Sequence, residues 1–133
     1  MASPTAAKTP GVKRPNPGEH HFDLAKVSQV KGGPGYSTAN GPCIEGDRMM
    51  VALMRMPAGT GAEPHSHPNE QWIYILEGTF EANIGGEVVT AQAGSVLYIP
   101  ANLVHSGVAT PDADVVFFTV KDTSHGLHGV KAA

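Results

Sequence analysis

The chain has 133 residues, a length that suits one domain with its own hydrophobic core and is too short for two cores of ordinary size. Its formal net charge is −3 and it contains no run of lysine or arginine, which argues against a nucleic-acid partner because the phosphate backbone is bound by basic surfaces. The only cysteine is Cys43, so an internal disulfide and a zinc site built from cysteine thiolates are both excluded.

The first residues differ in composition from the rest of the chain. Residues 1–18 contain four prolines among small and basic residues, so they offer little apolar surface to offset the entropy lost on ordering, and we expect a disordered tail. The expected folded domain is therefore 19–133. No segment has the apolar length of a signal peptide or of a membrane span, and we expect a cytoplasmic protein with no membrane partner.

Short apolar runs separated by turn residues occupy the chain beyond Phe22. With 16 glycines and 11 prolines the sequence turns often, and each run has the length of a strand, so the pattern predicts an all-β domain. Gly85 and Gly86 stand between two alternating runs and predict a two-residue hairpin. We therefore expect antiparallel strands in a barrel or sandwich. The predicted strands are Met49–Met56, Gln71–Leu76, Phe80–Ile84, Glu87–Ala91, Val96–Ile99, Val104–Val108 and Val115–Val120.

Two segments lack such runs. Residues 30–40 contain three glycines and little periodicity, which predicts a loop that leads into a strand containing Cys43 and Ile44. Such a loop could cover the mouth of a barrel. Residues 124–133 are too few for a packed element to be predicted.

Three histidines and a glutamine are the candidate metal ligands. His65 and His67 are two residues apart, so in an extended strand both imidazoles project from the same face, and Gln71 falls on that face if the register continues. His105 would reach the same place from a second strand. Three imidazoles and one amide oxygen that converge inside a barrel would bind one divalent transition metal and leave positions open for substrate or water. The His65 and His67 pair by itself is equally consistent with histidines that bind no metal.

Two groups of residues stand at spacings that are typical of a known family. The first group is Gly59, His65, His67, Gln71 and Gly78, and the second is Gly94, Pro100, Asn102 and His105. With these two motifs, at 59–78 and 94–109, the chain resembles the cupin superfamily. The resemblance implies a jelly-roll double-stranded β-barrel, and it implies that the metal is held by His65, His67, Gln71 and His105.

Three residues depart from these motifs. Asn102 stands in place of a turn glycine, which is tolerable because Asn adopts a left-handed backbone more readily than most residues, and Ala109 stands in place of a final asparagine. Gln71 replaces the usual ligand glutamate, so all four donors would be neutral and the ion would be a stronger Lewis acid, bound less tightly. The adjacent Glu70 is an alternative ligand, which would point to the opposite face unless a β-bulge intervenes.

The strands around the motifs suggest a mostly apolar substrate pocket. Its expected lining residues are Met54, Ile73, Ile75, Tyr98 and Phe117. Trp72 and Tyr74 alternate with the inward positions of their strand, so they should face outward, where a homodimer interface would cover them. The remaining histidines, His20, His21, His125 and His128, are expected to be exposed.

These features favour a mononuclear metal enzyme that acts on a small oxygenated organic molecule. The family resemblance offers dioxygenase chemistry and lyase, isomerase or decarboxylase chemistry, and the metal could be Fe, Mn, Ni, Co, Cu or Zn. The main alternative is a non-catalytic cupin that binds a small molecule through its metal. A sugar epimerase or isomerase is less favoured, because such pockets need several polar inward residues where this chain has Ile73 and Ile75.

Overall fold

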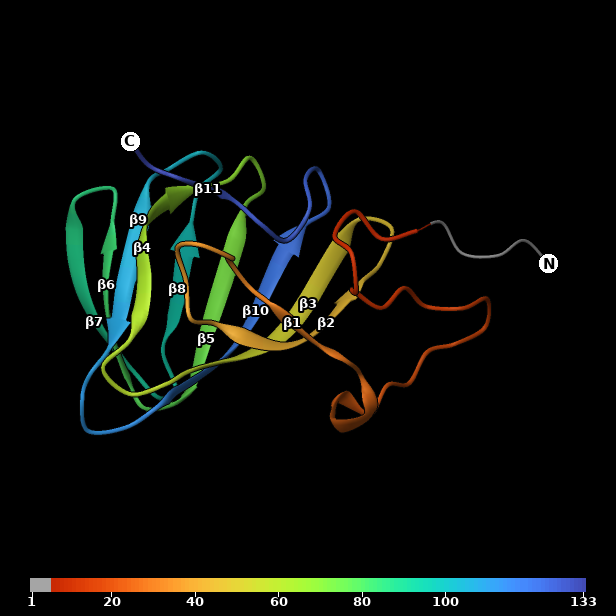
Figure 1. Cartoon of the computed structure of the whole chain (residues 1–133), viewed down its shortest axis with the longest axis horizontal. Coiled ribbons are helices and arrows are strands. Elements are labelled where there is room, and N and C mark those ends of the chain that lie inside the picture. The colour runs from red at the N-terminus through yellow and green to blue at the C-terminus, as the bar shows by residue number, and fades with distance from the viewer. Residues whose placement is uncertain (1–5) are drawn as a thin grey trace.

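The computed structural model describes residues 6–133, whose regular secondary structure is almost entirely β-strand (Figure 1). One short 3-10 helix, η1 (Leu24–Lys26), precedes the first strand. The strands are β1 (Gln29–Lys31), β2 (Asn40–Glu45), β3 (Met49–Met56), β4 (Gly61–Ser66), β5 (Gln71–Glu77), β6 (Thr79–Ile84), β7 (Glu87–Gln92), β8 (Val96–Ile99), β9 (His105–Ala109), β10 (Val115–Asp122) and β11 (Val130–Lys131).

Within the described residues the strands form two sheets, and every strand pair is antiparallel. The six-stranded sheet has the order β1-β2-β3-β10-β5-β8, and the five-stranded sheet has the order β11-β4-β9-β6-β7. Strands that are distant in sequence, such as β3 and β10, lie side by side, as Figure 1 shows. The core fills the space between the inner faces of the sheets. The predicted all-β jelly-roll architecture is confirmed.

Alternation along β5 and along much of β3 and β10 decides which side chains face the core. In β5, Gln71, Ile73 and Ile75 are buried, whereas Trp72 and Tyr74 are exposed. This is the period of two that a half-buried strand requires. The same alternation in β3 and β10 sends one set of side chains inward from each strand.

Two turns carry the backbone conformations that the sequence predicts. Gly85 and Gly86 join β6 to β7 with φ values of 60° and 97°, which glycine adopts without steric cost. Asn102 has a φ of 66°, so the asparagine takes the left-handed conformation that the turn before β9 needs. This turn sets the position at which His105 enters the barrel.

The N-terminal segment differs from the expected disordered tail. Residues 1–5 of that tail lie outside the described residues. In the described part Val12 is buried, and Lys13 joins the barrel through its backbone: its N–H donates to the Cys43 carbonyl at 3.2 Å, and its carbonyl accepts from the Glu45 N–H at 2.8 Å. The prediction is wrong here because the side of the barrel offers backbone and apolar partners that local composition does not reveal.

The C-terminal segment is also more ordered than expected. Leu127 is buried in the core, and β11 pairs with β4, so that Val130 lies opposite Ser66 and Lys131 opposite His65. These ten residues are too few to form an element of their own. They are ordered because β11 pairs with the edge of an existing sheet.

The outer face of β5 and β8 exposes large apolar side chains: Trp72, Tyr74, Val96 and Tyr98. This is the surface that a homodimer would cover, and the homodimer stays a prediction. Across residues 6–133 no helix has both the length and the apolar character needed to span a membrane.

Candidate metal centre

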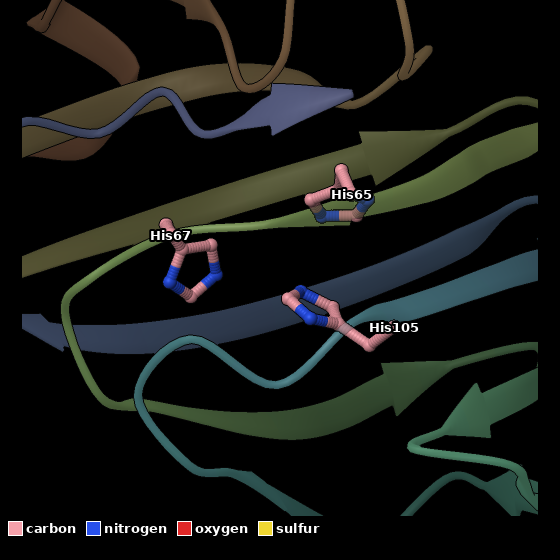
Figure 2. A group of neighbouring side chains, drawn as sticks. All are labelled: His65, His67 and His105. Atoms are coloured by element: carbon pink, nitrogen blue, oxygen red, sulfur yellow. The ribbon is translucent and has the colours of Figure 1, made fainter. Parts of the chain in front are cut away.

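Both sheets contribute to the candidate metal centre. His65 in β4 and His105 at the start of β9 lie directly opposite each other in the five-stranded sheet, and His67 follows one residue after β4 ends. Gln71 enters from the other sheet as the first residue of β5. Figure 2 shows the three imidazoles turned toward one another between the strands. The site therefore requires that the two sheets pack face to face.

The three histidines are close enough to share one ion. One ligand nitrogen from each lies within 4.8 Å of the others, and all three side chains are buried. The ring centroids of His65 and His105 are 4.2 Å apart, and those of His67 and His105 are 4.9 Å apart. At these distances the three rings surround a common point.

The Nδ1 atom of each imidazole faces a backbone carbonyl two residues away. The distances are 2.7 Å from His65 to Glu63, 2.8 Å from His67 to Asn69 and 2.9 Å from His105 to Leu103. A carbonyl can only accept, so Nδ1 carries the proton in each ring and Nε2 has the free lone pair. The local backbone thus leaves the Nε2 atom of each histidine free to bind a metal ion.

Burial keeps the imidazoles neutral in the metal-free protein. Removal from water lowers the pKa of His65, that of His67 to about 4 and that of His105 to about 3. The positive charge of Lys121 adds to this lowering at all three rings. At neutral pH no proton therefore competes with a metal for the Nε2 lone pairs.

The contact between His67 and Gln71 fits a site for a cation. His67 Nε2 lies 3.0 Å from Gln71 Oε1, although Nδ1 of the same ring donates to a carbonyl and a neutral imidazole has only one proton. Two acceptors therefore face each other in a buried place. Two ligand atoms that are each about 2.1 Å from one metal ion, at right angles, are about 3.0 Å apart. A metal would turn this repulsive contact into two coordinate bonds.

A second unsatisfied acceptor lies in the same place. His105 Nε2 is buried and has no hydrogen-bond partner among residues 6–133. Because buried polar atoms are almost always paired, such an atom calls for an explanation. His65, His67, Gln71 and His105 together fit one divalent transition metal, with open positions for water or substrate.

The amide of Gln71 is held in the orientation that a ligand needs. Its Nε2 donates to Thr119 Oγ1 at 2.8 Å, and the Thr119 hydroxyl donates in turn to the Trp72 carbonyl at 2.7 Å. The amide oxygen is therefore directed at His67. Thr119 in β10 acts as a support that orients the fourth donor.

Substituting Thr119→Val is expected to lower metal affinity by about 10- to 100-fold, the usual cost of removing a group that orients a ligand. Competition with a chromophoric chelator measures the change. The matched control is Thr123→Val, which removes another buried hydroxyl, bonded to the Asp47 carbonyl at 2.7 Å away from the histidines. Equal metal affinities in the two variants would contradict the role assigned to Thr119.

The structure separates Glu70 and Tyr98 from the centre. Glu70 is exposed, and its carboxylate accepts a hydrogen bond of 2.6 Å from the Tyr98 hydroxyl. The expectation that Tyr98 lines the pocket is wrong: its side chain is 41% exposed, because β8 alternates so that Leu97 and Ile99 face inward instead. The strand is regular at Gln71, so no bulge turns Glu70 toward the histidines.

A cavity of about 60 Å³ adjoins His65, Gln71 and His105. Of the expected lining residues, Met54, Ile73 and Phe117 form part of its wall, whereas Ile75 is fully buried in the core outside it. Further apolar groups come from residues that the sequence did not predict for the pocket, namely Ala39, Met56, Ala62, Phe80, Ala82, Ile84, Leu97, Ile99 and Leu127.

Several polar side chains of the cavity wall were also absent from the sequence prediction, and two of them, Tyr36 and Lys121, lie beside the candidate ligands. Tyr36 stacks on His65 with ring centroids 4.4 Å apart, and its hydroxyl accepts a hydrogen bond of 2.9 Å from the Gly129 N–H. Lys121 in β10 is 6% exposed, and burial lowers its pKa to about 8. The alternation of β10 was the signal for Lys121, since it shares a face with Phe117.

The comparisons with known proteins agree with this fold. Residues 52–121 match the model of the cupin domain family. KdgF from a Halomonas species has a similar structure, with a TM-score of 0.67 and 19% identity over 77% of this chain and 94% of that one. The polyketide cyclase RemF from Streptomyces resistomycificus gives a TM-score of 0.65 and 22% identity over 77% of this chain and 78% of that one. At these identities the similarity is one of fold.

One curated protein shows a local sequence match. The bifunctional lysine-specific demethylase and histidyl-hydroxylase NO66 of Branchiostoma floridae is 34% identical over 77 residues, which are 55% of this chain and 13% of that protein. The chain thus spans only a small fraction of this relative. The family match itself extends over more than half of the 133 residues and includes all four candidate ligands. The chain belongs to the cupin domain family.

Proposed function

We propose that the protein is a mononuclear metal-dependent enzyme that acts on a small oxygenated organic molecule. The observation that carries this proposal is the convergence of four buried, neutral acceptors beside a cavity, two of them only 3.0 Å apart. Perturbed titratable groups and a small pocket at one place are typical of an active site. Structural relatives include enzymes, among them the polyketide cyclase RemF and the DMSP lyase DddQ of Ruegeria pomeroyi.

The chain itself contributes binding, orientation and exclusion of water. His65, His67 and His105 would hold the ion by Nε2 and Gln71 by Oε1, while Thr119 keeps the amide in place. The apolar wall formed by residues such as Met54 and Phe117 limits the water that reaches the site. A bound divalent metal in such a site supplies Lewis-acid polarisation of a substrate oxygen.

Lyase, isomerase or decarboxylase chemistry is the class that the donor set supports best. Gln71 brings no negative charge where a carboxylate ligand would, so a divalent ion keeps its full charge and is less readily oxidised to a trivalent state. Dioxygenase chemistry is the second class. Uptake of dioxygen during turnover distinguishes the two, because only a dioxygenase consumes it.

The test compares metal-loaded and chelator-treated protein on a panel of small keto, enol, hydroxy and carboxylic compounds. We expect turnover that depends on the metal and disappears in His65→Ala. Dioxygen uptake is followed with an electrode in the same reactions. Saturable, metal-dependent binding of panel compounds without any turnover would favour the alternative, a non-catalytic small-molecule-binding cupin, and protein that binds no metal would refute both.

A further inference from the structure

Lys121 is a charged group in the cavity that has no role in the proposed function. It lines the same cavity as His65, Gln71 and His105, and it lies directly opposite Gln71 in the ladder between β5 and β10. It is 6% exposed. A lysine is rarely buried to this degree unless something compensates for its charge.

Within the described part of the chain, few groups compensate the positive charge of Lys121. Lys121 Nζ donates one hydrogen bond, of 2.8 Å, to the Leu127 carbonyl, and it belongs to none of the ion pairs within residues 6–133. The buried carboxylate of Glu45, two strands away in β2, is engaged elsewhere: it accepts from the Lys8 backbone N–H at 3.1 Å and 3.3 Å and lies 3.7 Å from Arg14. An ammonium group has three donors, and one protein acceptor leaves two of them available.

The neighbouring metal centre adds to this uncompensated charge. The four donors, three neutral imidazoles and one amide, bring no negative charge to a divalent ion. The ion and Lys121 would together place three positive charges in a buried site without a protein carboxylate. Electrostatics in such a low-dielectric place strongly favours a negatively charged guest.

We infer that the site binds a small organic carboxylate and that Lys121 holds its negative charge beside the metal, an inference that rests on the proposed metal site. A carboxylate has two oxygens, so one can approach the metal while the other accepts from the ammonium. The rest of the guest meets the apolar wall, including Met54 and Phe117, so a short hydrocarbon body suits it. Lys121 is thus a residue that determines specificity for an acid over its neutral analogues.

The test is calorimetric titration of purified protein with acetate, isobutyrate and benzoate and with the corresponding amides, which have similar shapes and no charge. The titrations use zinc-loaded and metal-free protein, so that binding is read without any turnover. We expect at least one carboxylate to bind about tenfold or more tightly than its amide. Lys121→Met should lower the carboxylate affinity by about 10- to 100-fold and leave the amide affinity unchanged, because a charge-assisted hydrogen bond has this strength.

Two further variants separate charge from structure. Lys121→Gln keeps a donor for the Leu127 carbonyl and removes the charge, so it should lose carboxylate binding as Lys121→Met does. Lys31→Met removes the same charge from an exposed position and should bind as the wild type does.

Equal carboxylate affinity in the wild type and both Lys121 variants would overturn the inference, and so would a failure of every carboxylate to bind more tightly than its amide. Either result in protein that takes up zinc would leave the proposed metal centre intact. Protein that takes up no zinc would refute the metal centre, and the metal-free titration would still decide whether Lys121 binds the anion.

Discussion

Substituting His105→Ala is expected to lower the affinity for zinc, cobalt or iron by more than about 100-fold. Removing a group that only orients a ligand already costs about 10- to 100-fold, and the loss of a ligand nitrogen removes the bond itself. His105 also supplies the buried Nε2 that has no other partner in residues 6–133. Plasma mass spectrometry of the purified protein measures retained metal, and chelator competition measures the affinity.

The control for this variant is His125→Ala, which makes the same substitution at an exposed position outside the cluster. It should retain as much metal as the wild type. Both variants are checked for folding by urea denaturation, so that metal loss is not confused with unfolding. If His105→Ala folded and kept its metal at wild-type affinity, the assignment of the ligands would be wrong.

Acidification from pH 6.5 to about pH 4.5 is expected to destabilise the metal-free protein. An imidazole in the unfolded chain takes up a proton near its ordinary pKa of 6.5, whereas burial holds the pKa of His67 at about 4 and that of His105 at about 3. The unfolded state therefore binds more protons in this interval, and the free energy of unfolding falls as the pH falls. For His67 alone the loss is on the order of 3 kcal/mol by pH 4.

Urea denaturation at half-unit steps of pH measures this slope. Carboxyl groups whose pKa is lowered by hydrogen bonds, such as Asp114 and Asp122, begin from an ordinary value of 3.8 and lose their contribution below this interval. His105→Ala should show a shallower slope than the wild type, and His125→Ala an unchanged one. A free energy of unfolding that stayed constant from pH 6.5 to pH 4.5 would show that the imidazoles are not buried in neutral form.

The local pattern of apolar and turn residues was sufficient to predict most of the strands. β3 and β8 begin and end at the residues that the apolar runs predict, and the Gly85 and Gly86 hairpin follows from two residues. Short-range features of this kind can be predicted because alternation and turn chemistry act over a few residues. β4 was not found as an apolar run, because its residues include Glu63 and Pro64 and it is ordered by pairing with β9.

The candidate site, like the strands, could be predicted only where it depends on residues that are close together in the sequence. The spacing of His65, His67 and Gln71 places three side chains on one face of an extended segment, and this could be predicted from the sequence. The convergence of His105 with them depends on register across β4 and β9, which the motif resemblance implied and the pairing of His65 with His105 now explains. Tyr98 was misplaced because an aromatic residue can lie on either face of its strand, and only the packing of neighbouring strands decides which.

By itself, therefore, the sequence determined the all-β fold class, the shared face of His65, His67 and Gln71 and the neutrality of these donors, since all three depend on residue type and short spacing. The tertiary structure alone decided that two acceptors, His67 Nε2 and Gln71 Oε1, lie face to face and that His105 Nε2 has no protein partner within residues 6–133. It also decided that Lys121 is buried in the cavity. Burial and the absence of partners are properties of the packed sheets, because they depend on residues far apart in the chain.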